Sequence, residues 1–443
     1  MAIAAGAVWE VRSTADAGNV GGGFFVTGAS GSDFSQQNSP QYALTGVTSA
    51  GAGNTVLHAS AAADMVGNGI KVISGTNFTV SWFEITSVVV GVSITCSTNA
   101  AGTAISIGVG ATGVMNVGGA ISLATTGASG DDDVFEACAA GNTWHIKSAT
   151  YTLGEAVSIT LAGTAASPIK VYGYQTTRGD NPTGTNRPLF ATGANGFTSG
   201  ASWWWYNMRF TGTASNAFAI GNEGIAVNCK SNNASTTSAR NAINGGTDTF
   251  IFNCEGQSNR GRGLATGGRN STYGCFFHDS NVGWLQSSTG QSSVINNIVS
   301  SNKSGAIVLT GALTTVTSIL NNTLYGYATA TGIGFSIATG NQNLRFNGNI
   351  IYGFATGVDH ADTQTEGFDD YNNYYNNTAD LSAAGEWQKG SHDTALDPAF
   401  TSVGEVAGTT GAFVAGDGKL VDTSKNFTSL GVVAGQDFVY IVS

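Results

Sequence analysis

Three ionisable side chains occupy the same place in successive segments of this chain and could together act on a sugar polymer. Glu223, Asp248 and Arg269 each lie six residues before the second member of a recurring two-residue step. Stacked segments would make Glu223 and Asp248 neighbours, with Arg269 next in line. Two carboxyl groups about 5–10 Å apart are the catalytic groups of glycoside hydrolases, and an arginine can hold a carboxylate. The alternative is a structural charge ladder in which Arg269 neutralises Asp248.

An aromatic run, Trp203-Trp204-Trp205-Tyr206, is the second candidate site. Neighbouring residues of a strand point to opposite faces, so one or two of these indole rings must face outward. An exposed indole can stack on a sugar ring or sit in a subunit interface. Burial beneath a long loop over 179–196 is the alternative.

The two-residue step returns about every 24 residues, which is the signature of a solenoid. A short apolar run usually precedes it. The steps are Asn207-Met208, Asn228-Cys229, Asn253-Cys254, Gly274-Cys275, Asn296-Asn297, Asn321-Asn322, Gly348-Asn349 and Asn372-Asn373.

Short β-rich runs punctuated by Asn, Gly and Ser indicate that each repeat is a coil of strands. Stacked coils place equivalent residues about 4.8 Å apart, and asparagines in such a column can hydrogen-bond along the stack. The fold class predicted is therefore all-β, a single-stranded parallel β-helix. Cys229, Cys254 and Cys275 share one register, so we expect inert thiols in its core.

Composition agrees with a β-solenoid. The chain has 63 Gly, 5 Pro, 10% charged and 41% hydrophobic residues, too few charges for a helical protein and enough apolar residues to bury a core. Its net charge of −11 argues against nucleic acid and anionic membranes as partners. Apolar runs are too short for a membrane span, and the N-terminus lacks the features of a secretory signal peptide.

Three regions are expected along the chain: an N-terminal β domain or cap over 1–130, the β-helix over 131–405, and a short C-terminal β segment over 406–443. The segment 420–443 resembles 56–74. Residues 413–443 are expected to pair with a neighbouring subunit, because an open strand edge invites pairing. The alternative is a hairpin docked on its own chain.

The stretches Thr143–Leu153 and Pro168–Tyr174, the Asn-step coils and Ser391–Phe400 resemble the pectin-lyase-like right-handed parallel β-helix superfamily. This resemblance covers roughly 260 residues and implies the right-handed sense of the coil, which is also the general preference for parallel crossovers. The superfamily includes lyases, hydrolases and non-catalytic virion spikes. The N-terminus, including Ala7–Arg12 and Ser32–Gln37, is similar to the N-termini of virion-associated β-helical proteins of phages.

Other ionisable groups are expected to be structural. Arg209, Lys230 and Glu255 directly follow the step and indicate an exposed ion-paired strip. His278-Asp279 could act as an acid/base pair, but no matching partner is evident in adjacent coils. The acidic turn over 131–133 could bind Ca²⁺, although no motif supports a cofactor or metal site. The segment 369–375 is expected only to turn the chain.

The favoured hypothesis is a non-catalytic phage virion protein on the head or tail surface. It is expected to be extracellular after lysis and to assemble with itself, as a trimer by analogy with β-helical spikes, and with other virion proteins. The first alternative is a tailspike-type depolymerase, a hydrolase or lyase acting on host surface polysaccharide through Glu223, Asp248 and Arg269. The second alternative is a carbohydrate-binding surface adhesin.

Overall fold

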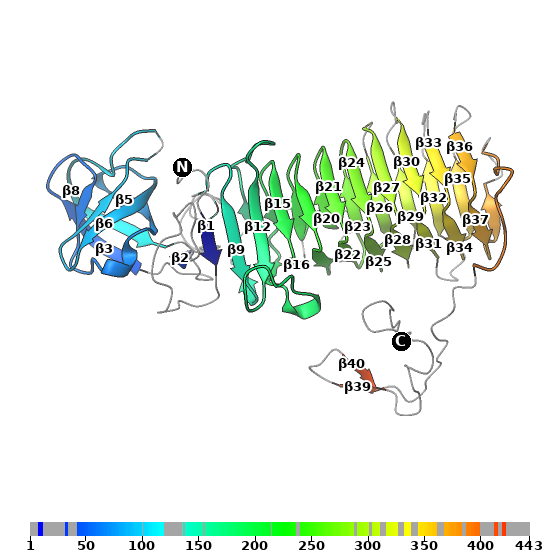
Figure 1. Ribbon diagram of the computed structural model, residues 1–443, viewed down its shortest axis with the longest axis horizontal. Helices are drawn as coiled ribbons and strands as arrows, with labels where there is room; N and C mark the ends of the chain where they lie inside the picture. Colours follow the sequence, from blue (N-terminus) through cyan, green and yellow to red (C-terminus); the bar gives the residue numbers. More distant parts are fainter. Residues whose placement is uncertain are drawn as a thin grey trace. The chain divides into compact units, whose positions relative to one another are not determined.

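The computed structural model shows an all-β chain built around a parallel β-solenoid of about 23 residues per turn (Figure 1). The structure describes residues 8–11, 32–33, 42–99, 101–118, 135, 138–153, 156–213, 215–235, 240–287, 290–300, 304–310, 316–326, 332–337, 344–360, 367–382, 387–398, 412–414 and 419–421. The acidic turn over 131–133 and most of 413–443 lie outside these residues. Within the described part of the chain, no helix is long and apolar enough to cross a membrane.

Three parallel sheets of 12, 10 and 10 strands, here called A, B and C, form the solenoid within the described residues. Sheet A contains β2 (Ser32–Asp33), β1 (Val8–Val11), β9 (Thr143–Lys147), β12 (Ile169–Tyr174), β15 (Trp203–Tyr206), β18 (Ile225–Val227), β21 (Thr249–Phe252), β24 (Asn270–Tyr273), β27 (Ser292–Ile295), β30 (Thr317–Leu320), β33 (Leu344–Asn347) and β36 (Gly367–Asp370).

Sheets B and C follow sheet A in each coil. Sheet B contains β10 (Thr150–Thr152), β13 (Leu189–Gly193), β16 (Arg209–Gly212), β19 (Lys230–Asn233), β22 (Glu255–Ser258), β25 (Phe276–His278), β28 (Ile298–Ser300), β31 (Thr323–Tyr325), β34 (Ile350–Tyr352) and β37 (Asn373–Tyr375). Sheet C contains β11 (Val157–Ser158), β14 (Phe197–Thr198), β17 (Phe218–Ile220), β20 (Asn241–Gly245), β23 (Arg262–Thr266), β26 (Val282–Gln286), β29 (Gly305–Leu309), β32 (Ile333–Ile337), β35 (Thr356–His360) and β38 (Ala379–Leu381). A 3₁₀ turn, η3 (Gly184–Asn186), lies in the loop between β12 and β13.

The recurring step forms the corner between sheets A and B. Its first member adopts a left-handed conformation in each coil, for example φ 58° at Asn207 and φ 64° at Gly274. Asn and Gly tolerate this conformation better than other residues, which explains their recurrence. In the last coil the left-handed residue is Tyr371 (φ 58°), so the step there is Tyr371-Asn372 and not the predicted Asn372-Asn373.

The second member of each step points into the core and forms the predicted ladder. The Nδ2 groups of Asn297, Asn322 and Asn349 each donate to Oδ1 of the asparagine in the next coil, at 3.0 Å. Each Oδ1 also accepts the backbone N–H of the preceding asparagine, as from Asn297 to Asn322 at 2.9 Å. Both the side chain and an otherwise unpaired corner N–H are thereby satisfied.

The cysteines continue the same column toward the N-terminus, as predicted. Cys229, Cys254 and Cys275 are buried and free, and the backbone N–H of Cys229 lies 3.4 Å from Sγ of Cys254. Burial raises the pKa of the Cys229 and Cys254 thiols. These residues therefore act as small core side chains.

A closed antiparallel barrel forms the N-terminal β domain (Figure 1). Its strands in spatial order are β3 (Tyr42–Ser49), β4 (Thr55–Leu57), β7 (Ser93–Cys96), β6 (Trp82–Val89), β5 (Gly69–Phe78) and β8 (Ser106–Val117), with a 3₁₀ turn, η1 (Ala63–Met65). Strand β1, which also belongs to the predicted region 1–130, pairs in parallel with β9 of the solenoid.

A hairpin of β39 (Ala412–Val414) and β40 (Lys419–Val421) belongs to a separate unit, Ala395–Ser443. Ala412 pairs with Val421, and Thr48 pairs with Leu57 between β3 and β4. The two pairs have the same sequence spacing, and Leu57 and Val421 each lie at the second position of the resembling segments 56–74 and 420–443. The predicted intersubunit role of this segment stays a prediction.

Candidate functional site

The outer face of sheet A carries a surface of aromatic side chains. Strand β15 alternates as a strand must: Trp203 and Trp205 are fully buried, whereas Trp204 and Tyr206 face outward and are half-buried. Part of the predicted aromatic run is thus core and part is surface. The alternation leaves one indole and one phenol available to a ligand.

Stacking along the coil axis orders the outward rings. Tyr206 stacks on Tyr172 of the preceding coil with ring centroids 4.6 Å apart and planes 13° apart, and Tyr172 stacks on His145. Lys170 lies over the Trp204 ring, with Nζ 5.3 Å from the centroid. The parallel register produces these stacks, because Tyr172 pairs with Tyr206 and Lys170 with Trp204.

Three further rings extend this surface over β21 and β24. Phe250, Phe252 and Tyr273 are 37–40% exposed, and the Phe252 and Tyr273 rings are parallel within 2° at 5.3 Å. We call Tyr172, Trp204, Tyr206, Phe250, Phe252 and Tyr273 the aromatic face. Contiguous exposed apolar surface is a feature of interaction sites, which makes this face a candidate site.

A groove of about 360 Å³ borders the aromatic face. Phe250 lines it, together with Asp248, Arg269 and Gln291 from the corner that precedes sheet A. The groove therefore combines an exposed ring with carboxylate, guanidinium and amide groups, the mixture found in ligand sites.

The predicted column exists in the register of sheet A. Ile225 pairs with Phe250, and Glu223 and Asp248 each come two residues earlier. Arg269 holds the same place in the next coil. Glu223 (φ 56°) and Asp248 (φ 59°) both adopt left-handed conformations, so the backbone turns in the same way at the two residues.

The polar contacts divide this column into two pairs. Arg269 Nε lies 2.6 Å from Asp248 Oδ1, and Arg269 Nη2 donates to Asp248 Oδ2 at 2.9 Å. Ser202 Oγ donates to Glu223 Oε2 at 2.8 Å. Adjacent coils place two such carboxylates about 4.8 Å apart along the stack, close to the spacing of retaining glycosidases. The catalytic role of the three residues stays a prediction.

A second ionisable cluster lies on the outer face of sheet B. Lys230 Nζ lies 2.6 Å from Glu255 Oε1, which also lies 3.1 Å from His278 Nε2. The other ring nitrogen of His278 is 2.8 Å from Asp279 Oδ2. The expectation that His278 has no partner in adjacent coils is therefore wrong, because Glu255 reaches it diagonally.

Electrostatics show that this cluster is a charge bridge. Glu255 is largely buried, but hydrogen bonds from His278 and Lys230 outweigh the cost of burial and lower its pKa to about 2. Burial acts to lower the pKa of His278, and the contacts with Glu255 and Asp279 raise it overall. Contact of both ring nitrogens with carboxylates suits the protonated imidazole. Such a histidine has no free nitrogen for acid/base chemistry.

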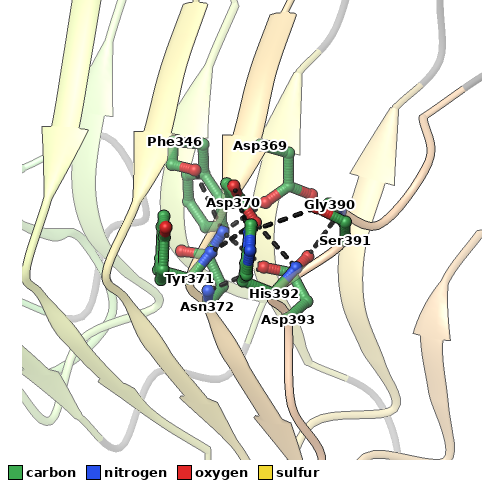
Figure 2. A network of polar contacts seen from close by, with 9 residues as sticks. All are labelled: Phe346, Asp369, Asp370, Tyr371, Asn372, Gly390, Ser391, His392 and Asp393. Atoms are coloured by element: carbon green, nitrogen blue, oxygen red, sulfur yellow. Dashed lines mark hydrogen bonds and ion pairs between the residues drawn. The ribbon is translucent and has the colours of Figure 1, made fainter.

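The third cluster closes the last coil (Figure 2). Asp369 takes the core position that Phe346 holds one coil earlier, and its Oδ2 accepts hydrogen bonds from Trp387 Nε1 at 2.5 Å and Tyr374 OH at 3.0 Å. Burial, and then the charge of Asp393, raise the pKa of Asp369 to about 7. The expectation that 369–375 only turns the chain therefore missed a partly buried titratable residue.

The neighbouring Ser391, His392 and Asp370 do not form a catalytic relay. Asp370 Oδ2 lies 2.9 Å and Ser391 Oγ lies 3.1 Å from the same atom, Nδ1 of His392 (Figure 2). A relay needs the acid and the nucleophile on opposite ring nitrogens. Among the described residues, no group of three His, Cys, Asp or Glu is placed to hold a metal ion.

Comparisons with known proteins find likeness in structure and not in sequence. No family model matches the chain, and no curated protein matches it. Similar solved structures include pectate lyase Pel9A, with 14% identity, TM-score 0.37, and coverage of 68% of this chain and 86% of that one. The A-module of the Azotobacter vinelandii mannuronan C-5 epimerase AlgE6 has 13% identity, TM-score 0.29, and coverages of 58% and 90%. The catalytic unit of a GH87 α-1,3-glucanase from Streptomyces thermodiastaticus has 11% identity, TM-score 0.32, and coverages of 79% and 87%.

Proposed function

We propose that this chain binds a polysaccharide along the outer face of sheet A. The observation that supports it is the aromatic face, in which two stacks of half-exposed rings, Tyr172–Tyr206 and Phe252–Tyr273, lie in register on either side of strand β18 and beside a polar groove. A sugar ring presents C–H groups that pack on aromatic faces, and its hydroxyls need polar partners at the side. A solenoid repeats such a platform along one axis, which suits a polymer better than a single small molecule.

Binding can be tested by affinity electrophoresis of the purified chain against a panel of neutral and acidic polysaccharides. The double variant Phe252→Ala/Tyr273→Ala should weaken binding at least tenfold, since each stacked ring contributes about 0.5–1.5 kcal/mol beyond its buried area. Tyr352→Ala is the matched control, because Tyr352 stacks on Tyr325 in the same manner but lies on sheet B. Equal loss in both variants, or no binding by the wild-type chain, would contradict the proposal.

Cleavage of the bound polymer is a second candidate function, as a depolymerase. It is favoured by the register that places Glu223 and Asp248 in adjacent coils, with Asp248 and Arg269 lining the groove beside Phe250. The bidentate contact between Asp248 and Arg269 equally suits a structural ladder.

The virion setting stays a prediction from the sequence, as does assembly into a trimer. Light scattering on the full chain would give its mass in solution, and a trimeric mass would support that prediction. A monomer would instead favour a polysaccharide-binding protein that acts alone.

A further inference from the structure

Two arginines meet at the corner between sheets A and B, one coil apart. Arg209 opens strand β16, and Arg187 lies in the loop before β13, two residues ahead of Leu189, the register partner of Arg209. Arg209 Nε donates to the backbone carbonyl of Arg187 at 3.1 Å. The guanidinium group of Arg209 is therefore held directly against the segment that carries Arg187.

A chain of amides positions the Arg187 side chain. Its Nε donates to the carbonyl of Pro182 at 3.3 Å, and its Nη2 donates to Oδ1 of Asn228. Asn228 Nδ2 donates in turn to Asn207 Oδ1 at 2.7 Å. Asn207 is 6% exposed and donates to Asn181 Oδ1 at 3.2 Å. The conformation of Arg187 is thus fixed before any ligand arrives, which reduces the entropy cost of binding.

Neither positive charge is neutralised within the part of the chain that the structure describes. The hydrogen bonds of Arg187 and Arg209 go to carbonyl and amide oxygens, whereas Lys230, which follows Arg209 in the column, pairs with Glu255. Burial, and then the nearby charge of Arg187, lower the pKa of Arg209. Two like charges held together gain most from an anion placed between or beside them.

The surrounding sequence is also locally basic. Residues 141–232 contain six Lys or Arg and three Asp or Glu, although the whole chain has a net charge of −11. The basic residues of this part are Lys147, Lys170, Arg178, Arg187, Arg209 and Lys230. An anionic ligand would therefore meet a more favourable field here than the net charge of the whole chain indicates.

We propose that Arg187 and Arg209 form a subsite for an anionic substituent, a carboxylate, sulfate or phosphate, on the polysaccharide that the aromatic face binds. This inference rests on the proposed function, because it names the class of polymer. The planar guanidinium group suits all three anions through paired N–H donors. Tyr206 of the aromatic face is separated from Arg209 only by the Asn207-Met208 corner, so a sugar stacked on this end of sheet A has its substituents next to the arginines.

The test compares charged polymers with neutral forms of the same backbone. Hyaluronan, alginate and polygalacturonate are each assayed beside their carboxyl-reduced derivatives, with dextran sulfate beside dextran. The wild-type chain should bind at least one anionic polymer tenfold or more tightly than its neutral form. Arg187→Gln/Arg209→Gln should remove that difference, and Arg260→Gln, which removes an exposed positive charge elsewhere, should leave it in place.

A second readout separates this inference from the proposed function. Inorganic sulfate should raise the melting temperature of the wild-type chain and of Arg260→Gln in a saturable manner, with no saturable component in Arg187→Gln/Arg209→Gln. Equal affinity for charged and neutral polymers, together with no saturable sulfate effect, would overturn the subsite while leaving polysaccharide binding intact. A saturable sulfate effect without binding of any polymer would support the subsite and contradict the proposed function.

Discussion

The carboxylate of Asp393 takes the place of an asparagine side chain against Asn372. Its Oδ1 accepts the backbone N–H of Asn372 at 2.7 Å, the contact that Asn372 Oδ1 makes with Asn349 at 2.8 Å one coil earlier. Asp393 has no side-chain N–H to pass on, and its Oδ2 instead accepts the N–H of Gly390 at 2.9 Å. The ladder therefore ends in a carboxylate, each of whose oxygens accepts a backbone N–H.

Removing one asparagine from the middle of the ladder should destabilise the solenoid strongly. Asn322→Ala leaves the backbone N–H of Asn297 without its acceptor in a buried corner, and the Nδ2 group of Asn297 keeps only its longer contacts with the carbonyl and hydroxyl oxygens of Thr272, at 3.3 and 3.4 Å. Each buried unsatisfied group costs about 1–3 kcal/mol, so we expect a loss of about 2–4 kcal/mol, measured by urea unfolding followed by circular dichroism. Asn321→Gly is the control, because the neighbouring residue is exposed with φ 54° and glycine adopts that conformation freely. Similar losses in both variants would refute a special role for the ladder.

The fold and the ladder could be predicted because the corner of each coil has the same two structural requirements. One residue must tolerate a left-handed φ and the next must fill a buried column, so Asn and Gly recur at a readable period. In the last coil the sequence placed the step one residue too late, because the left-handed residue there is Tyr371 and not an Asn or a Gly. His278 and Glu255 were not paired because their contact runs diagonally between coils, and a column-by-column comparison detects only residues in matching positions.

The free cysteines should resist thiol reagents in the folded protein. Cys96, Cys138, Cys229, Cys254 and Cys275 are all buried, and the thiolate needed for reaction is disfavoured there. Ellman's reagent should titrate essentially no thiol without denaturant and all five after unfolding in guanidinium chloride. A rapid reaction of one thiol under native conditions would place that residue at an accessible surface.

Depolymerase activity would require both carboxylates of the column beside the groove. If the chain cleaves the polymer it binds, Glu223→Gln and Asp248→Asn should each lower kcat at least 100-fold, the effect typical of losing a catalytic acid or base, with binding retained. Asp359→Asn in β35 is the control for a carboxylate outside the column. Reducing-end and unsaturated-product assays would separate a hydrolase from a lyase. A loss of melting temperature without loss of activity would instead assign the column to structure.

The charge bridge on sheet B should contribute stability in a window of mildly acidic pH. The pKa of His278 is raised in the folded chain. The contribution of His278 to stability is therefore fully present below about pH 6.5, the ordinary pKa of histidine, and is lost as pH rises through the pKa of the folded state. Glu255, with a pKa of about 2, contributes above its ordinary value of about 4.5 and loses that contribution as pH falls toward 2.

His278→Gln should therefore destabilise the chain by about 1–3 kcal/mol near pH 6 and by clearly less at pH 9. The melting temperatures of wild type and variant, measured across this range, give the difference directly. A difference that does not change with pH would show that His278 acts through packing on Phe276 and not through its charge.

Asp369 should make the last coil less stable as pH rises. Its folded pKa of about 7 lies above the ordinary value of 3.8, so the unfolded chain ionises first and stability falls between about pH 4 and pH 7 before levelling off. A shift of about three pKa units corresponds to about 4 kcal/mol at the plateau. Asp369→Asn removes the titration and should flatten this decline, whereas Asp359→Asn should follow the wild type. Hydrogen exchange of the amides in β36 and β37 at pH 5 and pH 8 measures the effect locally. Equal protection at both pH values in the wild type would mean that the hydrogen bonds from Trp387 and Tyr374 keep Asp369 ionised throughout.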